Sequence, residues 1–262
     1  MQKRRFIDQT YREIEIPFPP KRIISLVPSQ TELLFDLDLD EEIIGITKFC
    51  VHPEAKFKIK EKIGGTKQLN LAKIRSLKPD LIIGNKEENE QQQIEELMEE
   101  YPVWMSDIYN LKDALEMIKS IGELVDRQAK AKEIANEIQK SLEGLIIYPV
   151  KKVLYFIWKE PYMLAGKNTF IDEMLHRGGF ENIIQEQRYP ELSLEQLSSL
   201  KPDAVFLSSE PYPFKEKHVK TFQEIWPEAQ IQLVDGELFS WYGSRLLKSA
   251  NYFRALSGRF LL

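Results

Sequence analysis

Cysteine, long apolar runs and a signal-like N-terminus are scarce or missing in this sequence. The single cysteine, Cys50, cannot form an internal disulfide, so bridges say nothing about the redox compartment. No stretch approaches the roughly 18 uninterrupted apolar residues of a membrane-spanning helix. The first residues carry a basic cluster, Lys3 to Arg5, but no apolar signal-peptide core. If the chain begins at Met1, this pattern predicts a cytoplasmic protein.

Sequence motifs that carry catalysis are also missing. There is no glycine-rich phosphate loop, no G-x-S-x-G elbow and no pair of cysteines or histidines at metal-ligand spacing. The three histidines, His52, His176 and His218, lie far apart in the sequence. Cys50 and His52 are only loop neighbours, a pattern more typical of an idle buried thiol than of a thiol nucleophile. We therefore expect a protein that is not an enzyme and has neither a metal site nor a cofactor.

The bulk composition is that of an ordinary globular protein. With 262 residues, 43% of them hydrophobic and 29% charged, the chain is long enough for two modest domains with a sizeable core. Its formal net charge of −5 gives no basic surface for a nucleic acid or an anionic membrane. We expect a monomer that has no nucleic-acid partner.

One long apolar stripe lies in the middle of the sequence, over residues 111–145. Its apolar residues recur every three or four positions and no proline interrupts them, which predicts one continuous helix. At about 1.5 Å per residue such a helix would be about 50 Å long. A coiled-coil arm would instead need sustained charge pairs beside the stripe. We predict a connecting helix at 111–145 between an N-terminal lobe, 1–110, and a C-terminal lobe, 146–262.

Strand and helix patterns alternate on both sides of this stripe. In the first half we expect strands at 22–27, 42–47, 80–84 and 103–105, and helices that begin at Ser29 or Gln30, at 71 and near 90. In the second half we expect strands at 152–158, 204–207 and 231–234. The helices there should cover 169–177, 194–200, 219–226 and 244–256, with Gly178 and Gly179 ending the first of them.

The two halves of the chain share a sequence motif, which is called the phrase below. Residues 71–83 and 194–206 both read as a short helix that ends in Leu-Lys-Pro-Asp and leads into an apolar strand. Two copies on either side of a long helix indicate two lobes of similar design. We therefore predict an α/β protein with two Rossmann-like lobes, each with a central and mainly parallel sheet, bridged by one long backbone helix.

Polar and aromatic residues follow the predicted strands, where open α/β sheets bind ligands. Phe49 and Trp158 could equally be core residues at strand ends, and Glu87 and Glu88 could be solvated acids that open a helix. The aromatic loop at 239–242 would expose too much apolar surface unless something covers it. The candidates of the first lobe are Ser29, Gln30, Phe49, His52, Thr66, Lys67, Asn85, Lys86, Glu87 and Glu88, and those of the second are Trp158, Lys159, Tyr162, Glu210, Pro211, Tyr212, Phe239, Ser240, Trp241, Tyr242 and Arg245.

Several of these segments resemble a known family. The opening at 22–34, the Gly-Ile-Thr loop at 45–47, the Lys-Pro-Asp phrase at 70–83, the long helix and the strand after it are similar to the class III periplasmic substrate-binding proteins. The resemblance covers about residues 22–256. Within the family the sequence looks most like the members that bind cobalamin, whereas other members bind ferric siderophores, haem or metal ions.

This resemblance implies a ligand clamped in a cleft between two lobes, little hinge closure, and delivery to the membrane permease of an ABC importer. It also implies a periplasmic or membrane-associated location. Phe49 corresponds to an aromatic that packs on the corrin, Trp158 to a strand exit near the ligand, and 239–242 to another aromatic wall. Glu195 matches a glutamate that docks on the permease, but Ala72 stands at the equivalent place in the first lobe. A tryptophan expected near Thr66 is also absent.

We therefore expect a non-enzymatic binding protein for cobalamin or another corrinoid. Aromatic rings would stack on the ligand, while Arg245, Lys67 and Glu210 would meet its polar groups; metal coordination by His52 or Tyr162 is not indicated. A ferric-siderophore or haem binder is the alternative within the family, and it should show paired arginines or a tyrosine ligand. A cytoplasmic ligand sensor or interaction protein on the same scaffold is the alternative from another class.

Overall fold

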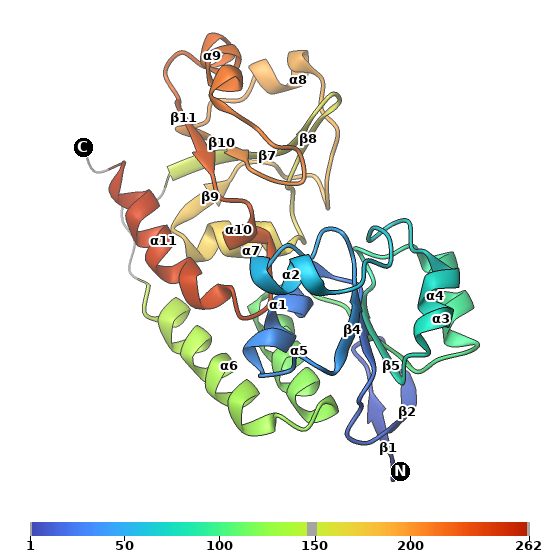
Figure 1. Cartoon of the computed structure of the whole chain (residues 1–262). Helices are drawn as coiled ribbons and strands as arrows, with labels where there is room; N and C mark the ends of the chain where they lie inside the picture. The colour runs from blue at the N-terminus through green and yellow to red at the C-terminus, as the bar shows by residue number, and fades with distance from the viewer. Residues whose placement is uncertain (1, 146–150, 261–262) are drawn as a thin grey trace. The chain divides into compact units, whose positions relative to one another are not determined.

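The computed structural model describes residues 2–145 and 151–260, and they form two compact units (Figure 1). Unit 1 contains the described residues up to Ile108, then Lys112–Gln139 and the short segment Tyr242–Arg245. Unit 2 contains Tyr109–Leu111, the described part of Lys140–Trp241, and the described residues from Leu246 onward. The predicted domain boundary at residue 146 lies outside the described residues.

Unit 1 is built on a parallel four-stranded sheet in the order β4-β3-β5-β6. Its apolar strands are buried nearly throughout, as parallel strands covered by helices usually are. The strands are β3 (Ile23–Ser25), β4 (Ile43–Ile46), β5 (Leu81–Asn85) and β6 (Val103–Ser106), and the helices between them are α1 (Pro28–Asp36), α2 (Glu54–Ile59), α3 (Leu71–Leu77) and α4 (Gln91–Met98).

Two features of unit 1 depart from the sequence-based prediction. An antiparallel hairpin of β1 (Lys3–Ile7) and β2 (Glu13–Pro17) precedes the sheet, where we expected no strands. Helix α1 begins at Pro28 after the N-cap residue Val27, so the predicted start at Ser29 or Gln30 is wrong. Proline suits the first helical turn because its missing N–H has no partner there anyway. Ser29 and Gln30 are thereby buried within the first turn.

The predicted continuous helix over 111–145 is also wrong. The chain forms α5 (Leu111–Leu124) and α6 (Gln128–Glu143), which lie side by side (Figure 1). Asp126 takes a left-handed φ of 59° in the turn, a conformation that aspartate tolerates better than most residues. A Cβ on Gly122 would come within 2.2 Å of the Ala131 Cβ, so glycine permits the close approach. Most of this segment belongs to unit 1.

Unit 2 has a five-stranded sheet in which β11, β10, β7 and β8 are ordered side by side and β9 also pairs with β7. All of its pairings are parallel except β7 with β8. The strands are β7 (Lys151–Lys159), β8 (Tyr162–Leu164), β9 (Phe180–Asn182), β10 (Ala204–Ser208) and β11 (Gln230–Val234). The helices are α7 (Phe170–Arg177), α8 (Leu194–Ser198), α9 (Glu216–Ile225), α10 (Glu237–Ser240) and α11 (Leu246–Gly258).

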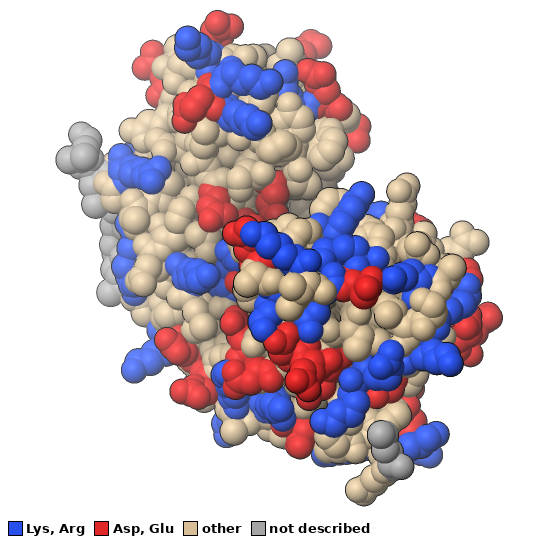
Figure 2. Space-filling model, in the orientation of Figure 1, with Lys and Arg blue, Asp and Glu red and all other residues tan. Residues whose placement is uncertain are grey.

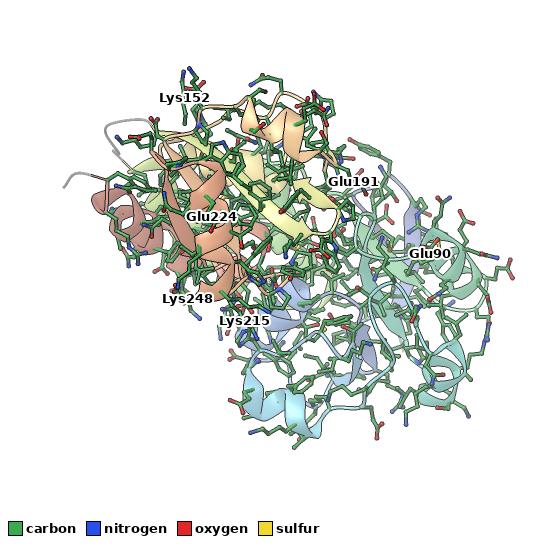
Figure 3. All side chains as sticks on the ribbon, turned by 90° about the horizontal axis from the view of Figure 1, so that it is seen from above. Glu90, Lys152, Glu191, Lys215, Glu224 and Lys248 are labelled. Atoms are coloured by element: carbon green, nitrogen blue, oxygen red, sulfur yellow. The ribbon has the colours of Figure 1, made fainter. Side chains whose placement is uncertain are left out.

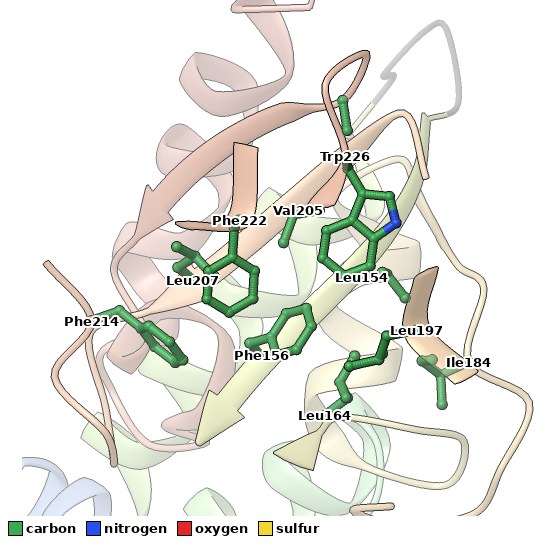
Figure 4. Close-up of a cluster of buried hydrophobic side chains, with 11 residues drawn as sticks. Leu154, Phe156, Leu164, Ile184, Leu197, Val205, Leu207, Phe214, Phe222 and Trp226 are labelled. Atoms are coloured by element: carbon green, nitrogen blue, oxygen red, sulfur yellow. The ribbon is translucent and has the colours of Figure 1, made fainter. Parts of the chain in front are cut away.

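Aromatic rings dominate the core of unit 2. Phe156 on β7 contacts both Phe222, at 4.8 Å between ring centroids, and Trp226, at 6.1 Å. Leu154 on β7, together with Val205 and Leu207 on the adjoining β10, belongs to the same cluster (Figure 4). Such rings bury a large area and add edge-to-face attraction. This core supports the carboxyl ends of β7 and β10.

The shared phrase forms equivalent structures in both units. In unit 1, the carboxylate of Asp80 accepts hydrogen bonds from the backbone N–H groups of Lys21 (2.8 Å) and Arg22 (2.9 Å), just before β3. In unit 2, the Asp203 carboxylate accepts from the N–H of Lys152 (2.7 Å), at the start of β7. The prediction of two α/β lobes with mainly parallel sheets is therefore confirmed.

The surface carries charge of both signs. Lysine and arginine side chains are interspersed with aspartate and glutamate on the face that Figure 2 shows, as the modest net charge of −5 predicts. Among the helices of the described residues, none is both long and apolar enough to cross a membrane.

Candidate functional site

Buried polar side chains close the carboxyl end of the unit 1 sheet. The Gln30 amide nitrogen donates to Ser106 Oγ at 2.6 Å, and Asn85 Nδ2 donates to the same oxygen at 2.9 Å. These three residues follow or end β3, β5 and β6, so adjacent parallel strands bring them together. Gln30 Oε1 has no hydrogen-bond partner among the described residues although it is buried. An unsatisfied buried acceptor is costly and can be relieved by a bound donor.

The loop after β5 is held by the turn that contains Thr66 and Lys67. Lys67 Nζ donates to the Glu87 carbonyl oxygen at 2.6 Å, and Asn89 Nδ2 donates to the Thr66 carbonyl oxygen at 3.1 Å. Asn85 Oδ1 accepts the backbone N–H groups of residues 87 and 88. The structure thus brings predicted site residues from separate strand exits together. It uses Lys67 to anchor a loop.

Cys50 follows β4 in the sequence and is fully buried. Its sulfur lies 3.1 Å from the hydroxyl oxygens of both Thr31 and Thr47. Burial raises the pKa of the Cys50 thiol to about 11, although these hydroxyls oppose the shift. A protonated, enclosed thiol is a poor nucleophile. His52 follows in the loop after β4 and is partly buried.

Phe49 is the exposed aromatic side chain of this end of unit 1. Its side chain is 50% exposed, which is unusual for a ring of this size. Lys48 Nζ lies 5.1 Å from the ring centroid. A Cβ on Gly65 would come within 3.1 Å of the ring, so glycine leaves room for it. One part of the ring is therefore packed and another part faces solvent.

The segment Tyr242–Arg245 is bound to unit 1 by buried polar contacts. Arg245 pairs with Glu32 through two hydrogen bonds of 2.8 and 2.7 Å, and both side chains are under 10% exposed. Tyr242 Oη donates to Glu88 at 2.8 Å. Burial, assisted by the Glu88 charge, raises the Tyr242 pKa well above its ordinary value. Arg245, predicted to meet polar ligand groups, contacts Glu32 in a buried pair.

Trp158 and Tyr212 form an aromatic pair at the carboxyl end of the unit 2 sheet. Trp158 belongs to β7 and is 40% exposed, and Tyr212 follows β10. Their ring centroids are 5.6 Å apart in an edge-to-face arrangement. Tyr162, from β8, packs instead edge-to-face against the core ring Phe222 at 5.7 Å.

Glu210 lies behind this pair, in the loop after β10. One carboxylate oxygen accepts from Ser240 Oγ at 2.6 Å and from Trp241 Nε1 at 2.9 Å. Burial raises the Glu210 pKa above its ordinary value, despite these two donors, and the nearby Glu237 charge adds to the shift. The carboxylate therefore orients Ser240 and Trp241 at the end of α10.

The prediction that residues 239–242 form a loop is wrong for its first two residues, which are helical. Residues up to Ser240 form α10, and Phe239 is completely buried against Tyr155 at 5.1 Å and Phe253 at 4.8 Å. Trp241 and Tyr242 are buried as well. The apolar surface that the sequence seemed to expose is therefore covered by the chain itself.

Sequence reasoning missed Ser106, Glu32 and His218 as parts of these sites. Ser106 ends β6 as Asn85 ends β5, so its strand-end position was the available signal. Glu32 offered no signal, because its partner Arg245 lies 213 residues away. His218 begins a helix and contacts Tyr212, as described below. Among the described residues, no group of three or more His, Cys, Asp or Glu could hold a metal ion.

Comparison with known proteins shows the family. A family model described as periplasmic binding protein matches residues 23–225. The chain belongs to the periplasmic binding protein family. Because this is a family of binding proteins, the prediction that the chain is not an enzyme is confirmed.

Vitamin B12-binding proteins are among the proteins that are similar to this chain. A vitamin B12-binding protein of Vibrio vulnificus is 29% identical over 197 residues, 72% of each chain. An uncharacterized ABC transporter substrate-binding lipoprotein of Bacillus subtilis is 26% identical over 92% of this chain and 81% of its own. The periplasmic vitamin B12 binding protein of Vibrio cholerae has the same fold, with a TM-score of 0.80, 20% identity, and coverage of 93% and 98%.

A haem-binding relative has the same fold. The periplasmic haem-binding protein of Roseiflexus in apo form matches with a TM-score of 0.78 and 19% identity, covering 92% of this chain and 97% of that one. The similar proteins are thus periplasmic or lipoproteins.

Proposed function

We propose that this chain is the solute-binding protein of an ABC importer, and that its ligand is a large metal chelate, in first place a corrinoid. The observation that carries the proposal is the pair of exposed aromatic side chains, Phe49 in unit 1 and Trp158 in unit 2. Each follows or ends a parallel strand at its carboxyl end, where α/β sheets bind ligands.

The physical argument concerns the cost of exposing these rings. Aromatic rings of this size are normally buried, and each gains stabilisation when a flat apolar surface covers it. Phe49 is contacted by Lys48 and Trp158 by Tyr212, so both rings are already oriented. Pre-oriented rings lose little conformational entropy on binding. A broad, flat ligand with polar edges fits this arrangement, and the vitamin B12-binding relatives favour a corrinoid.

A haem or ferric siderophore is the alternative ligand. The observation that favours it is Lys48, whose ammonium lies 5.1 Å from the Phe49 ring centroid and could attract carboxylates of an anionic chelate. The haem-binding protein of the same fold also supports this alternative. A sensor or interaction protein on the same scaffold remains the candidate if no such ligand binds.

Parallel calorimetric titrations with cyanocobalamin, haemin and a ferric catecholate test the proposal. We expect saturable micromolar or tighter binding of cyanocobalamin, and about tenfold weaker binding for Phe49→Ala and Trp158→Ala, since each loses a stacking ring. Tyr11→Ala is the matched control, because Tyr11 is a 91% exposed aromatic in the turn between β1 and β2. Tighter binding of haemin would select the alternative. If none of the three binds, the proposed function fails.

We also propose that Glu195 contacts the permease. It lies in the first turn of α8 and is exposed, and the equivalent position of α3 in unit 1 is occupied by Ala72. Docking would then depend mainly on unit 2. Glu195→Ala should weaken co-purification with the cognate permease, whereas Glu224→Ala, on α9, should not. Equal co-purification of both variants would exclude this role.

A further inference from the structure

His218 joins the start of α9 to Tyr212. Its Nδ1 accepts the backbone N–H of Lys215 at 2.9 Å. In a neutral ring the proton must therefore be on Nε2, which lies 3.4 Å from the Tyr212 hydroxyl oxygen and can donate to it. Figure 3 labels Lys215, just before α9, and Glu224, in its last turn. His218 thus accepts a hydrogen bond at the N-terminal end of α9 and also contacts Tyr212 of the aromatic pair.

Ring contacts continue from His218 to the exposed Trp158. The centroids of His218 and Tyr212 are 5.6 Å apart, and those of Tyr212 and Trp158 are also 5.6 Å apart. Phe214 packs against both His218, at 5.5 Å, and Tyr212, at 4.7 Å. His218 itself is only 6% exposed, so it acts on a ligand through Tyr212.

From this geometry we propose that neutral His218 is a positioning residue for ligand binding, because it holds Tyr212 edge-on against Trp158 and so orients the exposed ring. This inference rests on the proposed function, which makes Trp158 a ligand contact. His218 would thus orient the aromatic side chains of unit 2 without itself contacting the ligand.

Protonation of His218 breaks this arrangement. A doubly protonated ring has no acceptor for the Lys215 N–H, and it places a new positive charge near the ammonium groups of Lys217 and Lys215 on its own segment and Lys159 on β7. Burial, together with these lysines, lowers the His218 pKa below its ordinary value. The folded protein therefore holds the neutral ring near neutral pH. Ligand affinity should fall as the pH drops through that lowered pKa.

One substitution separates the helix-capping role from the positioning role. In His218→Gln, the side-chain oxygen can still accept the Lys215 N–H, because glutamine is a common partner at this capping position. The variant loses the ring and the Nε2–H donor that Tyr212 uses. Tyr212→Phe makes the complementary change, since it keeps the ring against Trp158 and removes the hydroxyl.

Calorimetric titration with cyanocobalamin at about pH 7.5 and at a series of lower values down to about pH 4 tests the proposal, because the His218 pKa lies below the ordinary histidine value. We expect His218→Gln to weaken binding about three- to tenfold at the higher pH, in line with the loss of one oriented aromatic contact. Wild-type affinity should fall at the lower pH values, and that of His218→Gln should not. The double variant with Tyr212→Phe should be no weaker than His218→Gln alone, because both act through one contact. His176→Gln, on the exposed face of α7, is the matched control.

The outcomes distinguish this inference from the function on which it rests. If no ligand binds the wild-type protein, the proposed function fails. If cyanocobalamin binds but His218→Gln keeps the wild-type affinity and pH profile, only the positioning role fails. Additive losses in the double variant would show that His218 does not act through Tyr212.

Discussion

Units 1 and 2 share a Lys-Pro-Asp turn and a parallel sheet, but the carboxyl ends of their strands differ in chemistry. In unit 1, amide and hydroxyl groups of Gln30, Asn85 and Ser106 are joined by hydrogen bonds. In unit 2, the aromatic rings of Trp158 and Tyr212 contact each other at the carboxyl ends of β7 and β10. Similar scaffolds therefore carry different side chains at their strand ends, a buried polar cluster in unit 1 and an aromatic pair in unit 2.

The strand ends of the two units differ in the kind of contact that their side chains make, hydrogen bonds in unit 1 and aromatic contacts in unit 2. Hydrogen bonds are directional, so a polar surface discriminates between ligands by the placement of donors and acceptors. Aromatic contacts are less directional and tolerate related flat ligands. Under the proposed function, ligand selectivity would depend mainly on the polar groups of unit 1, and apolar contact mainly on the rings of unit 2.

The largest effect should come from breaking the buried ion pair of unit 1. Arg245→Ala leaves the Glu32 carboxylate buried without its partner, and we expect a loss of about 3–5 kcal/mol in the free energy of unfolding. In unit 2, Glu173→Ala breaks the more exposed pair with Arg177 and should cost about 0.5 kcal/mol. Urea unfolding followed by circular dichroism measures both. Similar losses would contradict the distinction between the two pairs.

A smaller difference in lost stability should separate substitutions of the two aspartates of the repeated Lys-Pro-Asp motif, Asp80 and Asp203. Asp80 accepts two backbone N–H groups, whereas Asp203 accepts one among the described residues. Each hydrogen bond to a charged group contributes about 1.5 kcal/mol or more, so Asp80→Ala should cost about 3 kcal/mol and Asp203→Ala about half as much. The same unfolding measurement applies. A larger loss for Asp203→Ala would reverse the ranking.

The smallest effect should be a pH dependence that belongs to unit 2. Burial raises the Glu210 pKa, so the neutral acid is favoured on folding, and its contribution is greatest at low pH and declines as the pH rises through the folded pKa. Glu210→Gln keeps an acceptor for Ser240 and Trp241 and removes the charge. Its stability relative to wild type should therefore increase from about pH 4 to about pH 7. A constant difference over this range would mean that Glu210 titrates as in the unfolded chain.

The sequence predicted the elements that depend on local pattern. The repeated phrase, α3 from Leu71 to Leu77, and the strands of both sheets were recognisable because buried strands and proline-ended helices leave a local signal. The break between α5 and α6 was not recognised, because both helices keep their apolar spacing and the turn contains no proline. Gly122, which permits the close approach to Ala131, was the one local indication.

Exposure within the candidate site was harder to predict. Phe49 and Trp158 were named from their strand-end positions, and both are exposed. Phe239 and Arg245 were named by the same reasoning but are buried, because Tyr155 covers the first and Glu32 pairs with the second, and both partners lie far away in the sequence. Such partners depend on the tertiary fold. Whether the named residues contact a ligand remains a prediction.

The return of Tyr242–Arg245 to unit 1 has a consequence for the order of synthesis. Glu32 leaves the ribosome 213 residues before Arg245, which at about 5–20 residues per second is about 10–40 s earlier. During that interval the first-made unit carries an acidic group that must stay hydrated or protonated. Unit 1 therefore cannot form this buried ion pair when its first residues leave the ribosome. Its last folding step waits until the segment that contains Arg245 has been made.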